Sequence, residues 1–197
     1  MYTQILIPGI EPPLQIESLF FAFSPDEKTA ARIAELALQL REKCKLKGRP
    51  LRAERFHVSL YHVGDYSVVP QNVIDQAQQV AKTVTAPSFE LAFDLAASLP
   101  NSRDNKPFVL LTDENNTAFA TFQRTLGLRL RMSRLGRSIT ATSTPHLTLL
   151  YDNRTVLEEP VATVRWNVQE FVLVRSFQGQ TRYEQLGSWP LQASPLA

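Results

Sequence analysis

The tetrapeptide HVSL at residues 57–60 recurs as HLTL at residues 146–149, and both follow the pattern histidine, any residue, hydroxyl, leucine. The two copies hold two of the chain's three histidines. Side chains alternate between the two faces of an extended strand, so the histidine and the hydroxyl share one face and the two apolar residues share the other. Each tetrapeptide therefore predicts a strand with one apolar face toward a core and one face presenting an imidazole beside a hydroxyl.

Length and composition predict a globular protein. The 197 residues are 44% hydrophobic, which is enough for a sizeable core, and we expect residues 1–197 to form one domain of two lobes. Residues 1–15 lack the features of a signal peptide, and no later stretch is long enough to span a bilayer. We therefore expect a cytoplasmic monomer with no membrane partner. The single cysteine, Cys44, excludes an internal disulfide and a multi-cysteine zinc site.

The net charge of +2 is too small to indicate a nucleic-acid binder by itself. Its distribution is more informative, because five arginines fall in a short stretch without an intervening acidic residue. Two interpretations stay open: a solvated helix face, and a local positive field that attracts phosphate. The five residues are Arg124, Arg129, Arg131, Arg134 and Arg137.

The order of predicted elements is irregular for a doubly wound parallel sheet and favours an α+β fold. A helix with apolar residues on one face is expected to start with Ser24 as N-cap, Pro25 in its first turn and Glu27 closing a capping box. Each histidine motif follows a helix, which suggests two related lobes. Further helices are predicted at 71–84 and 116–135, and strands at 18–23, 89–95, 108–111, 168–176 and 181–186.

A pair of histidines, one neutral and one protonated, can act as base and acid in a single displacement at phosphorus. The hydroxyls of Ser59 and Thr148 can donate hydrogen bonds to non-bridging phosphoryl oxygens, where charge must be stabilised. A serine nucleophile is disfavoured, because no G-x-S-x-G turn surrounds either hydroxyl. A metal site is disfavoured as well, because no His-Glu-x-x-His or paired-carboxylate pattern accompanies the histidines.

The paired motifs resemble those of the two-histidine phosphoesterase superfamily, in particular its RNA 2',3'-cyclic phosphodiesterases, also called 2'-5' RNA ligases. Residues 20–23 before a proline-started helix, residues 145–150, and the C-terminal segments 170–173, 181–186 and 189–191 extend this resemblance. It implies a bilobal α+β fold in which two antiparallel sheets flank a central cleft, with helices outside. It also implies a reaction that requires no metal or cofactor.

The resemblance assigns roles to both histidines. It implies that His57 donates a proton to the leaving 3'-oxygen and that His146 accepts a proton from the attacking water, so that a cyclic phosphate opens to a 2'-phosphomonoester. With an RNA 5'-hydroxyl in place of water, the reverse chemistry would make a 2'-5' linkage. Ser59 and Thr148 then stabilise the phosphate.

Strand alternation also makes predictions for the residues that follow the first motif. Tyr61 is expected on the face of His57, either to stack on a base or to pack at the rim, and His62 on the opposite face. Tyr183 matches a tyrosine position of the family, with substrate binding and core packing both open. Arg137 is a candidate phosphate contact, as are Arg55 and Arg154.

Three functions remain from the sequence. The first is hydrolysis of an RNA-terminal 2',3'-cyclic phosphate. The second keeps the mechanism but takes a small substrate, a nucleoside 2',3'-cyclic phosphate or an ADP-ribose cyclic phosphate, because a small substrate needs no long basic track. The third is a non-catalytic RNA-binding module in which imidazoles and hydroxyls clamp a phosphate. The intact pair of histidines favours catalysis over simple binding.

Overall fold

A computed structural model describes residues 15–100, 104–112, 116–180 and 182–193. The signal-peptide prediction for residues 1–15 therefore falls almost wholly outside the described residues. None of its helices is long and apolar enough to cross a membrane. The strands are β1 Glu17–Phe23, β2 Val58–Tyr66, β3 Phe89–Ser98, β4 Lys106–Thr112, β5 Thr140–Ala141, β6 His146–Asp152, β7 Glu159–Val168, β8 Glu170–Phe177 and β9 Arg182–Pro190. The α-helices are α1 Glu27–Lys43, α2 Gln71–Ala81 and α3 Thr117–Arg131, with short 3-10 helices η1 Ala53–Arg55 and η2 Arg134–Arg137.

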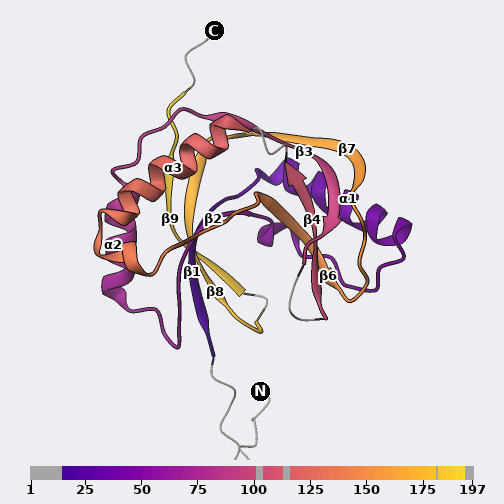
Figure 1. Cartoon of the computed structure of the whole chain (residues 1–197), viewed down its shortest axis with the longest axis horizontal. Helices are drawn as coiled ribbons and strands as arrows, with labels where there is room; N and C mark the ends of the chain where they lie inside the picture. Colours follow the sequence, from indigo (N-terminus) through magenta and orange to yellow (C-terminus); the bar gives the residue numbers. More distant parts are fainter. Residues whose placement is uncertain (1–14, 101–103, 113–115, 181, 194–197) are drawn as a thin grey trace, which may run out of the picture.

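The two motif strands, β2 and β6, are neighbours at the centre of the sheet (Figure 1). The strand order is β7-β3-β4-β6-β2-β1-β8-β9, with antiparallel pairing throughout, and β5 pairs with β2. The halves β7-β3-β4-β6 and β2-β1-β8-β9 are joined between β2 and β6 by one ladder pair, Val58 with Leu147. The α+β class with antiparallel pairing is confirmed. The two sheets expected from the sequence are joined into one, because this single pair makes the hydrogen-bonded ladder continuous.

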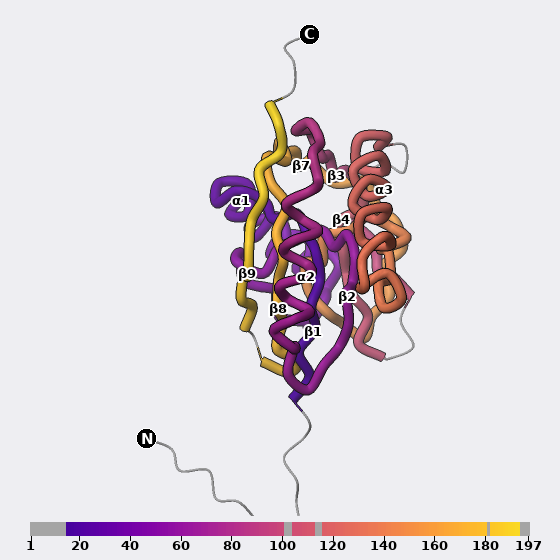
Figure 2. The backbone as a smooth tube through the Cα atoms, turned by 90° about the vertical axis from the view of Figure 1, so that its left-hand side faces the viewer, coloured from indigo at the N-terminus to yellow at the C-terminus, as the bar shows by residue number. Residues whose placement is uncertain are grey.

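The main core lies between the sheet and the helices. Helix α1 packs against β6 and β7, α2 against α3 and β9, and α3 also against β3. In the rotated view of Figure 2, α2 lies with β9 on one side and α3 on the other. The rings of Phe122 in α3, Phe23 in β1 and Phe171 in β8 meet there, with centroids 4.9 Å and 5.1 Å from that of Phe122. Aromatic packing of this kind fixes α3 over β1 and β8.

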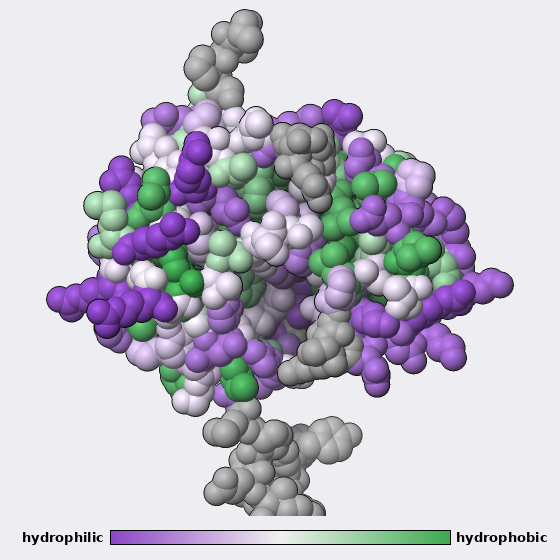
Figure 3. Space-filling model, in the orientation of Figure 1, coloured by the Kyte–Doolittle hydropathy of each residue, from purple (hydrophilic) through white to green (hydrophobic). Residues whose placement is uncertain are grey.

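The opposite face of the sheet, here called the inner face, has only two small apolar clusters among the described residues. One lies on β1 and β8, and the other on β3 and β4, and neither belongs to the main core. The surface of the molecule is hollowed between the two halves (Figure 3). The buried members of the clusters are Phe20, Ala22, Val172 and Val174 in the first, and Ala97, Val109 and Leu111 in the second.

The helix ends differ from the sequence predictions. The N-cap of α1 is Asp26, not Ser24, because the two carboxylate oxygens of Asp26 accept hydrogen bonds from the backbone N–H and the hydroxyl of Thr29, both at 2.9 Å. These bonds also hold the pKa of Asp26 below its usual value. Helix α2 ends at Ala81, before the predicted residue 84, and the predicted third helix breaks after Arg131 into the separate 3-10 turn η2.

Candidate active site

Strand β2 contains a β-bulge directly after the hydroxyl of the first motif. The ladder with β1 shifts register between the partners of Ser59 and Tyr61, so Leu60 is the extra residue. An extra residue reverses the alternation of side chains beyond it. Tyr61 therefore points into the main core, where it is only 4% exposed, and His62 returns to the face of His57. The alternation predicted for Tyr61 and His62 was wrong for this reason.

Strand β6 repeats the same irregularity. Its ladder with β4 shifts between the partners of Thr148 and Leu150, which leaves Leu149 as the extra residue. Leu150 is consequently buried in the main core, and Tyr151 emerges on the inner face with His146 and Thr148, 43% exposed. Sequence reasoning gave Tyr151 no role in the site. Its hydroxyl interacts with that of Thr148, and burial raises the pKa of the Tyr151 phenol.

The two bulges are held in a reciprocal way. The carbonyl of Leu60 accepts hydrogen bonds from the Thr142 N–H at 3.1 Å and from the Gln123 amide at 3.2 Å. The carbonyl of Leu149 accepts one from the Leu51 N–H at 2.8 Å. Thr142 lies in the segment that leads into the second motif, and Leu51 in the segment that leads into the first. Each motif strand is thus positioned by the approach to the other.

The two imidazoles have the same backbone anchor. Nδ1 of His57 lies 2.8 Å from the carbonyl oxygen of Arg55, and Nδ1 of His146 lies 2.8 Å from the carbonyl oxygen of Thr144. A carbonyl oxygen only accepts hydrogen bonds, so each Nδ1 must hold the proton. Nε2 is then the nitrogen that gains or loses a proton at each motif.

The surroundings of His57 are aromatic. Its ring centroid lies 5.0 Å from that of Phe20 and 5.5 Å from that of Tyr183, and the Arg55 guanidinium lies 4.6 Å from the centre of the Tyr183 ring. Burial lowers the pKa of His57 to about 4; the Arg55 carbonyl opposes this shift, and the positive charges of His146 and Arg55 add to it. His57 is therefore neutral at pH 7 in the free chain.

His57 lines a pocket of about 380 Å³ together with residues of η1, β8 and β9. Arg55 also lines it, and its Nε atom is buried without a hydrogen-bond partner among the described residues. An orphaned buried donor is costly, so this nitrogen is a natural contact for an anionic ligand. The remaining lining residues are Ser24, Glu54, Phe56, Val174, Arg182, Tyr183 and Gln185.

The structure brings together most, but not all, of the residues predicted for the site. The ladder partners of Ser59 and Thr148 are Ala22 and Val109, members of the two inner clusters, which places both hydroxyls on the inner face with the histidines and Tyr183. Two predicted residues lie elsewhere: Tyr61 in the core, and Arg137 on η2, where it lines a separate pocket formed by residues 131–137. Across the described ranges, no three His, Cys, Asp or Glu side chains group as metal ligands do.

Comparison with known proteins agrees with this geometry. A family model described as the 2'-5' RNA ligase superfamily matches residues 19–180. Escherichia coli LigT is similar in structure: its complex with ATP is 27% identical with a TM-score of 0.67, covering 90% of this chain and 99% of LigT, and its complex with 3'-AMP is 27% identical with a TM-score of 0.68, covering 89% and 98%. The protein TT0787 of Thermus thermophilus, 17% identical with a TM-score of 0.69 over 90% of this chain and 100% of its own, shares the fold. No curated protein sequence matches.

Proposed function

The chain belongs to the 2'-5' RNA ligase superfamily, as the resemblance of its motifs predicted, and we propose that it opens the 2',3'-cyclic phosphate at an RNA end to a 2'-phosphomonoester. The observation that supports this best is the pair of imidazoles with matching backbone anchors, which leaves Nε2 of both His57 and His146 for proton transfer. We further propose that it works as a cytoplasmic monomer without a metal ion.

In the proposed hydrolysis, a water oxygen attacks phosphorus and Nε2 of His146 takes the proton of that water. The bond between phosphorus and the 3'-oxygen breaks, and Nε2 of His57 gives its proton to the departing oxygen. The phosphate stays on the 2'-oxygen. Ser59 and Thr148 donate hydrogen bonds to the non-bridging oxygens, where negative charge must be stabilised as the transition state forms. Attack by an RNA 5'-hydroxyl in place of water would make a 2'-5' linkage.

The charge state of His57 must change on binding for it to act as the acid. Its pKa of about 4 leaves it neutral at pH 7 in the free chain. A phosphodiester anion bound between the two imidazoles favours the protonated form, because an opposite charge at close range stabilises a cation. Arg55 stacks on Tyr183, and its Nε has no hydrogen-bond partner in the described part of the chain, so it is well placed to hold the same anion. We include Arg55 and Tyr183 in the substrate site and leave Tyr61 and Arg137 out.

A second candidate substrate is a small cyclic nucleotide. The related LigT was crystallised in complex with ATP, with NADP+ and with 3'-AMP, which are small nucleotide ligands. The 380 Å³ pocket beside His57 is in the volume range of sites for such molecules. The same acid and base would open a nucleoside 2',3'-cyclic phosphate.

The test is turnover of an oligonucleotide that ends in a 2',3'-cyclic phosphate, in excess chelator, with the product identified as the 2'- or the 3'-phosphate. We expect a 2'-phosphate. A nucleoside 2',3'-cyclic phosphate run in parallel, over a range of salt concentrations, separates the two substrates, since only a polymer should show a steep loss of affinity with salt. RNA binding without turnover of either compound would instead support a binding module and overturn the proposal.

A further inference from the structure

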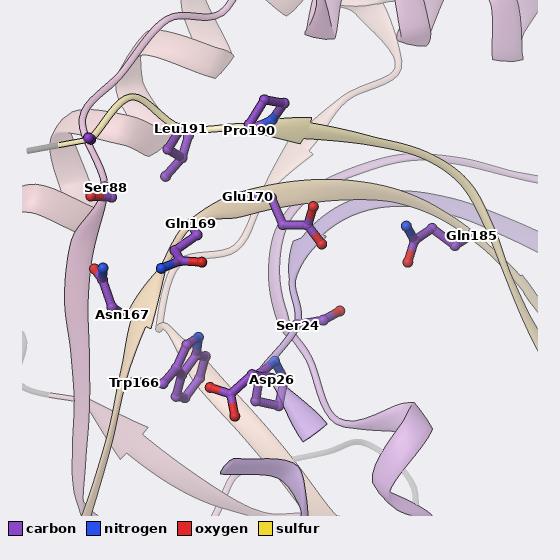
Figure 4. Close-up of a pocket in the computed structure, with 12 residues that line it drawn as sticks. Ser24, Asp26, Ser88, Trp166, Asn167, Gln169, Glu170, Gln185, Pro190 and Leu191 are labelled. Carbon is purple, nitrogen blue, oxygen red and sulfur yellow. The ribbon is translucent and has the colours of Figure 1, made fainter. Parts of the chain in front are cut away.

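A second pocket, of about 820 Å³, adjoins the pocket of His57. The two share Ser24 and Gln185, so a ligand that leaves the first along the sheet enters the second. Its walls come from the start of α1, from the turn between β7 and β8, and from β9 (Figure 4). The proposed reaction uses no group of this pocket.

One wall holds a buried donor without a partner. Trp166 is 5% exposed, and its Nε1 atom has no hydrogen-bond partner within the described ranges. Its ring is fixed by stacking on Phe93, with centroids 5.2 Å apart and an interplanar angle of 7°. Figure 4 shows the indole nitrogen on the edge of the ring that is turned toward the side chain of Gln169 and the pocket. A buried N–H left unpaired is destabilising, so this donor indicates a ligand acceptor.

Amide side chains supply further groups. Asn167, Gln169 and Gln185 line the pocket, and none of the three side chains makes a hydrogen bond to another described residue. An amide both donates and accepts, which is the combination that reads the edge of a nucleobase. In Figure 4, Asn167 and Gln169 lie on the Trp166 side, whereas Gln185 extends from β9 at the opposite end.

The charge of the pocket argues against a phosphate as its occupant. Asp26 and Glu170 line it, and no described lysine or arginine does. Both carboxylates already accept hydrogen bonds, Asp26 from Thr29 and Glu170 from the Ser188 hydroxyl, but a carboxylate has further acceptor sites. They favour an uncharged ligand that carries N–H donors.

We propose that this pocket binds the nucleobase of the nucleotide that precedes the cyclic-phosphate end. The base would offer a carbonyl oxygen to the indole N–H of Trp166 and an exocyclic amine to Asp26 or Glu170, a combination that cytosine and guanine have and that uracil and adenine lack. The inference rests on the function proposed above. It names the substrate as an oligonucleotide of at least two residues and not a mononucleotide.

The experiment compares kcat/KM for a nucleoside 2',3'-cyclic phosphate with that for dinucleotides that end in the same cyclic phosphate and carry C, G, U or A in front of it. We expect the dinucleotides with C or G to be turned over at least about tenfold better than the mononucleotide, as two or more added hydrogen bonds predict. Those with U or A should fall between the two.

The variant Trp166→Phe keeps a ring against Phe93 and removes the N–H. We expect its advantage for the C and G dinucleotides over the mononucleotide to shrink about 2- to 10-fold, the effect of one neutral hydrogen bond. The matched control is Trp189→Phe, which changes the other tryptophan; Trp189 packs on Phe171 and does not line the pocket, so the advantage should be unchanged. If Trp166→Phe does not fold, Gln169→Ala, an exposed position, takes its place and should reduce the same advantage.

The outcomes separate this inference from the function on which it rests. No turnover of any cyclic phosphate would overturn the proposed function itself. Turnover that is equal for mononucleotide and dinucleotides, or an advantage that is the same in Trp166→Phe and in the unsubstituted chain, would overturn only the base-binding pocket. A preference confined to U or A would overturn the assigned hydrogen-bond pattern.

Discussion

The strands β2 and β6 share a backbone arrangement but differ in their surroundings. In both, the imidazole is anchored through Nδ1 to the carbonyl two residues earlier, and a hydroxyl follows two residues later. In both, a bulge comes next, and its carbonyl is bonded to the segment that leads into the other motif. The fold therefore repeats, in each half, the geometry that places an imidazole and a hydroxyl on the inner face.

The surroundings of the two histidines differ. His57 lies against the rings of Phe20 and Tyr183, whereas the ladder partner of His146 on β4 is the aliphatic Leu111. Arg55, the residue that anchors His57, carries a charge, and its counterpart Thr144 does not. Matching backbone geometry thus coexists with different surroundings, and burial among aromatic rings lowers the pKa of His57.

The largest expected effect is the loss of either imidazole. His57→Ala and His146→Ala should each lower kcat by about 10²- to 10⁴-fold, the usual contribution of one acid or base. The measurement is turnover of a 2',3'-cyclic phosphate, with circular dichroism to confirm folding. A variant that keeps the full rate would remove its histidine from the mechanism.

A substrate with sulfur in place of the 3'-bridging oxygen tells the two histidines apart. A thiolate leaves without taking up a proton, because a thiol is far more acidic than an alcohol. We expect this substrate to restore much of the rate of His57→Ala and little of the rate of His146→Ala. The lowered pKa of His57 makes the opposite result informative: rescue of His146→Ala alone would exchange the two roles.

The next largest effect is on stability, at Gly48, which lies before the first motif and packs against the end of β6. A Cβ atom at Gly48 would lie 2.0 Å from the backbone oxygen of Tyr151, and neither backbone can move far. Gly48→Ala should lower the free energy of unfolding by about 3 kcal/mol, the upper range for overpacking. Gly127→Ala in α3 is the comparison, since the nearest atoms to its Cβ would belong to the hydroxyl and ring of Tyr61, a side chain and not a backbone, so its loss of stability should be smaller. Denaturant unfolding of both variants measures the difference, and equal losses would contradict it.

The sequence predicted the elements but not the irregularity that arranges the site. Apolar alternation and the paired motifs predicted both motif strands and the shared face of His57 and Ser59, because these depend on local geometry. The bulges at Leu60 and Leu149 were not predicted, because they depend on hydrogen bonds from residues distant in the sequence and no local residue type indicates them. Tyr61 was misplaced and Tyr151 overlooked for this one reason. Ser24 and Asp26 are both typical N-cap residues and lie two positions apart, and the hydrogen bonds from Thr29 to Asp26 decide which of them caps the helix.

A smaller effect on stability is expected at Asp152, which ties β6 to the loop before the first motif. Its buried carboxylate accepts backbone N–H groups of Lys47, Gly48 and Arg154, at 2.6, 2.7 and 2.8 Å. Burial alone would raise its pKa, but these bonds hold the pKa of Asp152 below the usual 3.8. Asp152→Asn should cost about 1–2 kcal/mol at pH 7.

The stabilisation by Asp152 should depend on pH. The folded pKa lies below the unfolded one, so the stabilisation is present above pH 3.8 and is lost as the pH falls through the folded pKa. The difference between Asp152→Asn and the unsubstituted chain should therefore shrink in acid. The control is Asp65→Asn after the first motif, an exposed carboxylate paired with His62 and Ser18, whose loss should cost less. A difference that stays constant down to pH 2 would contradict this account.

The smallest effect concerns the charge of Arg55, which distinguishes the residue that anchors His57 from Thr144, the residue that anchors His146. Arg55→Thr gives the first half the residue type that Thr144 supplies in the second, and it leaves the backbone carbonyl in place. We expect the pKa of His57, followed by NMR, to rise above about 4 but to stay below 6.5, because burial, the main cause of the shift, remains. Between pH 6.5 and about 4, the folded chain binds fewer protons at His57 than the unfolded chain does, so stability falls as the pH drops through this range. Because Arg55→Thr raises the folded pKa, this pH range should be narrower in the variant. A pKa of His57 that does not move would show that the Arg55 charge has no part in lowering it.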